Sequence, residues 1–246
     1  PVDEQGINLD ALEETLKTTK IRMVYITPHH HYPTTVTLSA QRRVQLLQLA
    51  QQHGFIIIED DYDYDFQYDK GAIMPLASAD TNGMVIYIGS FGKSLVPTFS
   101  TGFVVAPQNF IAEMKKYLGI LDRRGDMIME QVLGEMIAEG DIHRHLKKSL
   151  KVYRERRNHC CALLAKHLGH QISYNVPTGG LAVWLEWNSP VSLLKLANDC
   201  QKHDLFIPKN ILYQNKKTTA IRLGFGHLTM EEMEKSLEIL SGCLTI

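Results

Sequence analysis

Apolar and polar residues form two different patterns along this chain. Short runs rich in β-branched residues predict buried strands, and stretches with an apolar residue every three or four positions predict amphipathic helices. In the first two thirds, strands are expected over residues 21–26, 55–58, 84–88 and 102–105. One helix is predicted from Asn8 to about Thr18, and another from a cap at Ser39 to a stop at Gly54. This alternation predicts an α/β architecture with mostly parallel strands.

The pattern changes in the last part of the chain. Residues 108 to about 168 have a helical pattern, with breaks expected at Gly125 and at Gly140-Asp141. Strands are then expected over 172–175, 181–187 and 221–225, and helices over 192–202 and from residue 230 onward. The sequence therefore predicts three parts: a large domain over 1–140, a connecting basic helix over 141–168, and a small α+β domain over 169–246.

Composition excludes several classes of protein. The 246 residues are 44% hydrophobic, which is enough for a buried core. The chain has 26 basic and 27 acidic residues, so its net charge is −1 and does not attract nucleic acid or an anionic membrane. No apolar stretch approaches the roughly 20 residues of a membrane span, and the first residues are unlike a signal sequence. The four cysteines lack metal-ligand spacing and disulfide density, which predicts reduced thiols in a cytoplasmic protein.

The basic stretch over residues 143–157 has two interpretations. It could form a nucleic-acid surface, or it could be a helix that bridges two lobes. Leucines and valines recur among its charges at helical spacing, which favours the bridging helix.

A lysine and a group of carboxylates both follow predicted buried strands. Lys93 comes shortly after the run that ends at residue 88, and Glu59-Asp60-Asp61 follows the run over 55–58. Each feature alone indicates an exposed side chain, a helix cap or a solvated turn. Together they predict one sheet edge that offers an amine and a carboxylate. A pyridoxal phosphate site needs both, because the amine forms a Schiff base with the aldehyde and the carboxylate keeps the pyridine nitrogen protonated.

Several segments, in this order, resemble the aminotransferase-like domain of MocR-type regulators of the GntR group. They are YITPHHHYPT at 25–34, the Arg42-Arg43 helix, EDDYD at 59–63, YIGSFGKSLVP at 87–97, YRERR at 153–157 and IRLGF at 221–225. The resemblance covers essentially the whole chain. It implies the fold of type I pyridoxal-phosphate-dependent transferases, with an incomplete, mostly parallel large domain followed by a small α+β C-terminal domain.

The resemblance also implies roles for individual residues. Lys93 would be the Schiff-base lysine, Asp60 the partner of the pyridine nitrogen, Tyr62 a donor to the ring hydroxyl, and Ser90 a phosphate contact. The residues themselves do not decide between Asp60 and Asp61, and Asp60 is chosen on the resemblance alone.

Two further residues are candidates for binding a small-molecule effector. By resemblance, Arg222 binds the α-carboxylate of an amino acid. The alternative is a surface ion pair, but the flanking apolar residues indicate a buried strand and favour the ligand role. The resemblance also implies that the loop at residues 29–31 lies over the cofactor, so His30 or His31 could touch the cofactor or the effector, and His31 is the residue chosen. An ordinary polar loop is the alternative. Consecutive histidines in an extended loop point in alternating directions, so no metal site is expected at His29-His30-His31.

Three departures from the family pattern weaken the expected cofactor site. Ser100 stands where the family has an arginine that binds the cofactor phosphate; losing such a contact, worth ~1.5–3 kcal/mol, weakens affinity by roughly 10- to 100-fold. Gly92 and Thr35 stand where serine and glycine are usual. The chain is also expected to be N-terminally truncated, because the resemblance begins inside the domain. It would then lack a glycine-containing phosphate loop and a winged-helix DNA-binding domain.

Three functions follow from this sequence. The leading hypothesis is a pyridoxal-phosphate-binding, effector-sensing and dimerisation domain of a transcription regulator, with an internal aldimine at Lys93. It would sense an amino acid or vitamin-like molecule, form a homodimer, and reach DNA only through a domain outside this chain. The alternatives are a class I/II aminotransferase acting on an amino acid, and a degenerate dimerisation scaffold without cofactor. The regulator-like segments 59–63 and 153–157 and the missing arginine favour the regulator over the enzyme.

Overall fold

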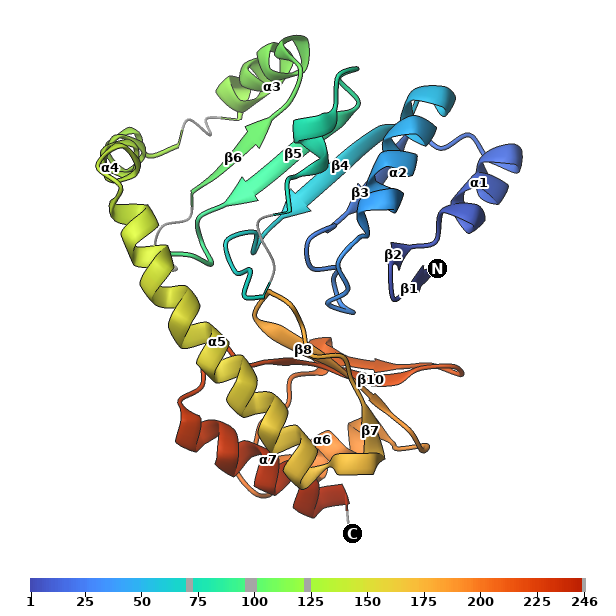
Figure 1. The fold of residues 1–246 in the computed structure, drawn as a ribbon, viewed down its shortest axis with the longest axis vertical. Coiled ribbons are helices and arrows are strands. Elements are labelled where there is room, and N and C mark those ends of the chain that lie inside the picture. Colours follow the sequence, from blue (N-terminus) through green and yellow to red (C-terminus); the bar gives the residue numbers. More distant parts are fainter. Residues whose placement is uncertain (70–72, 96–100, 122–124, 245–246) are drawn as a thin grey trace. The chain divides into compact units, whose positions relative to one another are not determined.

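The computed structural model describes residues 1–69, 73–95, 101–121 and 125–244. It divides into two compact units (Figure 1). Unit 1 comprises residues 1–32 and 36–148, and unit 2 comprises residues 33–35 and 149–246. The division between the units falls within the long helix α5 (Asp141–His167). A single helix thus spans nearly all of the predicted segment 141–168, and it contributes residues to both units.

Unit 1 is built on a four-stranded sheet in the order β3-β4-β5-β6. Strands β3 (Met23–Ile26), β4 (Ile56–Asp61) and β5 (Val85–Ser90) run parallel to one another. Strand β6 (Gly102–Val105) is antiparallel to β5. The mostly parallel sheet predicted from the sequence is thus confirmed. A short hairpin of β1 (Val2–Asp3) and β2 (Gly6–Ile7) precedes it and was not predicted.

One face of this sheet is covered by α1 (Leu9–Thr18) and α2 (Ala40–His53), as Figure 1 shows. The predicted caps are present: Asn8 and Ser39 accept backbone N–H groups at the two helix starts, and Gly54 ends α2 with a left-handed φ of 68°. The core under these helices consists of apolar side chains from the helices, the strands and the connecting loops. They are Leu9, Leu12, Ile26, Leu38, Leu46, Leu49, Ala50, Phe55, Ile57, Leu76 and Val85.

The opposite face of the sheet is much less covered. Met23 and Tyr25 of β3 are 62% and 61% exposed, and Ile58 of β4 and Ile88 of β5 are partly exposed. Parallel strands are usually buried on both faces, so this open face is unusual. Side chains alternate along a strand, and the register of β4 against β5 places Asp60 and Ser90 on this open face.

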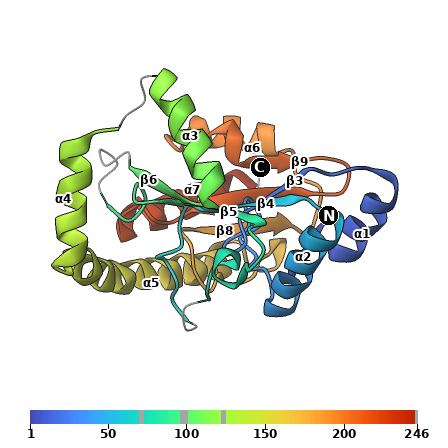
Figure 2. The ribbon, with the colours of Figure 1, turned by 90° about the horizontal axis from the view of Figure 1, so that it is seen from above.

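The helical region after β6 contains the predicted breaks. Helix α3 (Gln108–Ile120) is followed by α4 (Met127–Ala138), and a turn at Gly140 precedes α5. Figure 2 shows α3, α4 and α5 as three separate helices. A single turn of 3-10 helix, η1 (Leu76–Ala79), lies between β4 and β5. No helix in the described ranges has the length and apolar character needed to span a membrane.

Unit 2 is an α+β structure, as the sequence predicts. Its four strands form an antiparallel sheet in the order β7-β8-β10-β9. They are β7 (Ile172–Ser173), β8 (Ala182–Trp187), β9 (Leu212–Gln214) and β10 (Thr219–Gly224). The unit also contains the single turns η2 (Gly169–Gln171) and η3 (Lys209–Ile211) and the helices α6 (Leu193–Gln201) and α7 (Met230–Leu244). Strand β9 was not predicted.

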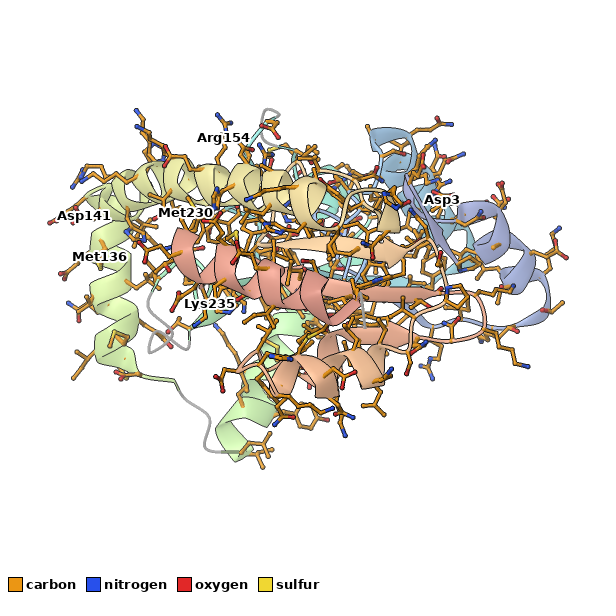
Figure 3. The ribbon with its side chains drawn as sticks, turned by 90° about the horizontal axis from the view of Figure 1, so that it is seen from below. Asp3, Met136, Asp141, Arg154, Met230 and Lys235 are labelled. Carbon is orange, nitrogen blue, oxygen red and sulfur yellow. The ribbon has the colours of Figure 1, made fainter. Side chains whose placement is uncertain are left out.

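The part of α5 in unit 2 is amphipathic. Cys160 and Leu164 are buried, whereas Arg154 is exposed and projects from the outer side of the helix (Figure 3). The charges of the basic stretch therefore share a helix with residues that pack in a core. All four cysteines of the chain are buried and free.

Candidate functional site

The two predicted reactive segments lie at the same edge of the sheet in unit 1. Strands β4 and β5 are parallel neighbours, with Asp60 opposite Ile88 and Asp61 opposite Gly89. The loop after β4 begins with Tyr62-Asp63-Tyr64-Asp65 and is called the acidic loop below. The carboxyl ends of parallel neighbours meet at one sheet edge, so the acidic loop and the turn that carries Lys93 start at the same edge. The expectation that amine and carboxylates share one edge is confirmed.

Asp60 lies on the open face and has a tyrosine partner. The Tyr25 hydroxyl donates a hydrogen bond to the Asp60 carboxylate. The pKa of Tyr25 is raised to about 12, first by partial burial and then by the hydrogen bond and charge of Asp60. Tyr25 and Asp60 therefore form a polar pair on an otherwise apolar surface that includes Ile58 and Ile88.

Asp61 projects to the other face and is buried. Its Oδ1 lies 2.6 Å from His29 Nδ1, and both side chains are 1% exposed. The second ring nitrogen, His29 Nε2, lies 2.8 Å from the backbone oxygen of Ile73 and therefore donates an N–H to it. The sequence left Asp60 and Asp61 as alternatives for the partner of the pyridine nitrogen. The structure places Asp60 on the same face as Ser90 and places Asp61 in the interior.

A buried arginine and glutamate surround the Asp61 pair. Glu59 accepts the backbone N–H groups of Leu76 at 2.8 Å and Ala77 at 2.9 Å, and so caps the η1 turn. Burial is the largest cause of the raised pKa of Glu59, and these two hydrogen bonds oppose it. The pKa of Arg43 is lowered chiefly by burial, while the charges of Glu59 and Asp61 act in the opposite direction. Opposite charges thus compensate one another beneath the sheet edge.

Arg43 also ties three segments together. Its guanidinium donates to the backbone oxygens of Leu38, Met74 and Pro28, each at 3.1 Å. The planar, five-donor guanidinium can satisfy several carbonyls at once, which an ammonium on a flexible stem does less well. Arg43 lies in one of the segments that resemble the family, but its burial does not follow from the local sequence.

A second buried histidine–carboxylate pair holds the acidic loop. His30 Nδ1 lies 2.7 Å from Asp63 Oδ1, and both side chains are buried. Tyr62, between the paired acids in sequence, donates its hydroxyl to the backbone oxygen of His30 at 3.1 Å. The loop that contains His31 is therefore fixed to the acidic loop at two points. His31 is partly buried, which lowers the pKa of its imidazole.

Lys93 lies in the turn after β5 and is exposed. The Gly92 N–H donates to Ser90 Oγ at 3.1 Å, so the Ser90 hydroxyl shapes the start of this turn. On the other side of Lys93, the buried Ser94 hydroxyl donates to the carboxylate of Asp65. Ser100, where the family has an arginine, lies outside the described residues.

His29, Glu59 and Asp61 could also be considered as metal ligands. Their candidate donor atoms all lie within 4.8 Å of one another and all three residues are buried. However, both nitrogens of His29 and both oxygens of Glu59 already make hydrogen bonds, and only Asp61 Oδ2 lacks one among the described residues. A metal ion would have to displace these bonds, so the hydrogen-bonded network accounts for the cluster.

Arg222 belongs to unit 2, so its position is described separately from that of Lys93. It lies in the middle of β10, opposite Trp184 of β8, and is partly buried. Its neighbour Ile221 is buried, as the predicted apolar strand requires. The Trp184 ring packs 5.0 Å from the ring of Tyr213 on β9, so Arg222 emerges beside an aromatic surface.

Thr35, another departure from the family pattern, has an unusual backbone conformation. Its φ is 61°, in the left-handed region that glycine adopts without strain and that a β-branched residue rarely adopts. Threonine thus occupies a backbone conformation that suits the glycine usual in the family at this position.

Comparison with known proteins places this chain in a single family. Residues 1–240 match the family model for aminotransferase class I and II. An aromatic-amino-acid aminotransferase of Thermococcus litoralis is 27% identical over 248 residues, which cover 98% of this chain and 60% of that protein. The helix-turn-helix-type transcriptional regulator YdeL of Bacillus subtilis is also 27% identical over 248 residues, covering 100% of this chain and 53% of the regulator.

Solved structures show the same fold. The α-aminoadipate aminotransferase LysN of Thermus thermophilus, determined in complex with N-(5'-phosphopyridoxyl)-L-leucine, superposes with a TM-score of 0.89 at 26% sequence identity. The match covers 100% of this chain and 64% of LysN. The chain thus spans between half and two thirds of the length of these relatives, and has the fold of type I pyridoxal-phosphate-dependent aminotransferases.

Proposed function

The chain belongs to the class I and II aminotransferase family, and from this premise we propose that it is the effector-sensing and dimerisation domain of a MocR/GntR-type transcription regulator. In this proposal it binds pyridoxal phosphate, attached covalently through Lys93. One observation carries the proposal: Asp60 of β4 and Ser90 of β5 share the open face of two parallel neighbouring strands, and the turn with Lys93 directly follows β5.

The residues at this edge fit pyridoxal phosphate. Asp60 offers a carboxylate on the open face, where it could accept a hydrogen bond from a protonated pyridine nitrogen, and Lys93 offers an exposed amine. Ser90 offers a hydroxyl to the phosphate, and Tyr62 a phenol to the ring. The cofactor, when bound, supplies an aldehyde and a ring that accepts electrons.

The buried residues beneath Asp60 support its position. The His29–Asp61 pair and the three carbonyl contacts of Arg43 hold the end of β4 and the loops beside it. Tyr25 donates to Asp60 and so orients its carboxylate. A charged group held by fixed partners needs little reorganisation when a ligand arrives, so these contacts favour tight binding.

The proposed effector is an amino acid or a vitamin-like molecule. Arg222 is assigned to an effector carboxylate, because its guanidinium can make two parallel hydrogen bonds to such a group. His31 is assigned to the effector or the cofactor. Its partly buried imidazole with a lowered pKa favours the neutral form, which can both donate and accept a hydrogen bond.

Two relatives favour different versions of this function. The similarity to the regulator YdeL supports a sensor, in which DNA is reached through a domain outside this chain. The equal similarity to an aromatic-amino-acid aminotransferase supports a second candidate, an enzyme that transfers the amino group of an amino acid. The regulator is proposed first because segments 59–63 and 153–157 resemble those of MocR-type regulators. If Ser100 leaves the phosphate without its partner, a dimerisation scaffold without cofactor is the third candidate.

An absorbance titration with pyridoxal phosphate tests the proposal. The wild-type chain, Lys93→Ala and the control Lys116→Ala, an exposed lysine of α3, are titrated and then treated with borohydride. We expect a new absorbance band and a borohydride-fixed pyridoxyl group on Lys93 in the wild type and the control, and neither in Lys93→Ala. Absence of the band from all three would reject cofactor binding and leave the scaffold.

Two activity measurements then distinguish the regulator hypothesis from the enzyme hypothesis. Steady transfer of an amino group from an amino acid to a keto acid would establish the enzyme. Effector-dependent DNA binding by a longer protein that contains this domain, without such turnover, would establish the sensor.

A further inference from the structure

We propose that Asp65 and Ser94 act as a positioning pair that holds the turn carrying Lys93 against the acidic loop. This inference rests on the proposed function only for the role it gives to Lys93. Asp65 lies in the loop after β4, and Ser94 directly follows Lys93 in the turn after β5. The contact therefore joins the two segments that the sheet edge brings together.

The Ser94 side chain is well placed for this role. It is 5% exposed, although Lys93 beside it is exposed, and its hydroxyl donates to the carboxylate of Asp65. The backbone N–H groups of Ser94 and Leu95 both donate to the backbone oxygen of Phe91, at 3.2 and 2.9 Å. The lysine thus sits on a closed turn whose buried side is fixed at Ser94.

The surroundings of Asp65 disfavour its charged form, so the hydrogen bond from Ser94 stabilises it. Burial is the largest cause of the raised pKa of Asp65, the neighbouring carboxylates of Asp61 and Asp63 raise it further, and the Ser94 hydroxyl lowers it. A desolvated carboxylate near two others is stabilised by any donor that can reach it. The hydroxyl of Ser94 is such a donor, and a charge-assisted hydrogen bond of this kind is stronger than a neutral one.

A second contact holds the backbone of the same residue. His145 Nε2, from the first turns of α5 within unit 1, lies 3.0 Å from the backbone oxygen of Ser94. Ser94 is therefore held through its side chain by the acidic loop and through its carbonyl by a helix. Two anchors on one residue restrict the rotation of the turn, and so the directions available to the neighbouring Lys93 side chain.

This restraint matters for any group that must react with Lys93 while bound to Asp60. The acidic loop is itself fixed, since Asp63 pairs with His30 and Tyr62 donates to the His30 carbonyl. The hydrogen bond between Ser94 and Asp65 therefore fixes the position of the turn with Lys93 relative to the end of β4, where Asp60 lies. Rates of reaction between held groups depend steeply on such placement. Asp65 and Ser94 are proposed to act through Lys93, without touching the ligand.

A double-mutant cycle tests the pair. Ser94→Ala, Asp65→Asn and the double variant are compared with the wild type, and Ser78→Ala, which removes an exposed hydroxyl in η1 of the same unit, serves as control. The probe is pyridoxal phosphate, and the first readout is the rate at which a borohydride-fixed pyridoxyl group accumulates on Lys93. We expect each single variant to slow attachment by about tenfold, and the double variant to be no slower than Ser94→Ala, because the negative charge that Asp65→Asn removes acts on the turn through the Ser94 hydroxyl.

Two further readouts separate positioning from general destabilisation. Amide hydrogen exchange should accelerate over residues 91–95 in Ser94→Ala and Asp65→Asn, with exchange in α2 unchanged. The pH at which the Lys93-bound chromophore changes its spectrum should also move in these variants and stay fixed in Ser78→Ala. Unchanged attachment together with unchanged exchange, or additive effects in the double variant, would overturn the pair.

Failure of the proposed function would be recognised separately. If the wild type attaches no pyridoxal phosphate, the proposed cofactor role of Lys93 is rejected, and the exchange experiment alone decides whether Asp65 and Ser94 hold the turn. Faster exchange over residues 91–95 in both single variants, not increased further in the double, would support the pair, and unchanged exchange would overturn it.

Discussion

Asp60 and Asp61 are consecutive in β4 but project from opposite faces of the sheet. Asp60 accepts the Tyr25 hydroxyl on the open face, and Asp61 is buried against His29. Strand alternation forces this separation, so the two carboxylates cannot exchange roles without a change of register. Chemically identical side chains are thereby assigned different tasks: Asp60 is available to a ligand, and Asp61 helps to hold the fold.

This separation predicts opposite effects of two matched substitutions. Asp60→Asn should weaken pyridoxal phosphate binding by roughly 10- to 100-fold with little change in stability, because it removes only the charge that we propose pairs with the pyridine nitrogen. Asp61→Asn should lower the free energy of unfolding by about 3 kcal/mol, because it breaks a buried pair with His29. Cofactor titration and urea unfolding of both variants measure this. Equal losses of stability in the two would contradict the assignment.

Arg43 provides a test of the buried network alone. Arg43→Lys should lower the free energy of unfolding by about 3 kcal/mol, since one ammonium cannot replace three guanidinium contacts to separate carbonyls in a buried site. Arg144→Lys is the control: this arginine pairs with Asp141 at an exposed position, where the cost is below about 1 kcal/mol. Urea unfolding of both variants provides the comparison, and similar midpoints would count against a structural role for Arg43.

The left-handed conformation of Thr35 predicts a stabilising substitution. Thr35→Gly should raise the free energy of unfolding by roughly 0.5–1 kcal/mol, because relief of backbone strain exceeds the entropy that glycine loses on folding. Asp204, with a φ of 64°, is the matched control. Aspartate tolerates this region better than a β-branched residue, so Asp204→Gly should have a smaller effect. A larger gain from Asp204→Gly would show that strain at Thr35 is relieved in another way.

Much of the fold could be predicted because its signals are local. The caps at Asn8 and Ser39, the stop at Gly54 and the strand over 102–105 each depend on a few adjacent residues, and all are present in the structure. The hairpin of β1 and β2 and the three-residue strand β9 were missed. Such short segments carry too few residues to show a period, and their pairing with neighbours defines them.

The candidate site was predicted only in part, for a related reason. Lys93 and the acidic residues could be placed at one sheet edge because each follows an apolar run. The His29–Asp61 pair joins residues 32 positions apart, and the Ser94–Asp65 contact joins residues 29 apart, so no local pattern shows either one. For His29, His30 and His31, the sequence spacing could only argue that the three side chains do not bind one metal ion together. It could not show that two of them pair with buried carboxylates.

The raised pKa of Asp65 predicts how stability depends on pH. A carboxyl whose pKa is higher in the folded than in the unfolded chain binds protons more tightly when folded, so its contribution to stability falls as pH rises through the window between the two values. That window opens near the unfolded value of about 4. Relative to Asp65→Asn, which cannot titrate, the wild type should therefore lose stability as the pH increases from about 4 toward neutrality. Urea unfolding of both proteins across this range is the measurement, and a difference that stays constant with pH would refute the prediction.

Arg222 allows the effector assignment to be tested apart from the cofactor. If its guanidinium binds an effector carboxylate through two hydrogen bonds, Arg222→Lys should weaken the affinity for amino acids by roughly 10- to 100-fold, because an ammonium cannot reproduce the paired contact. Attachment of pyridoxal phosphate at Lys93 should be unchanged.

The measurement is the change in the cofactor spectrum on titration with a panel of amino acids and with the matching amines that lack the carboxylate. The amines should bind weakly to the wild type and lose little affinity in the variant, since they have no group for Arg222 to hold. Equal losses for amino acids and amines would place Arg222 in the support of its sheet and not in contact with the ligand.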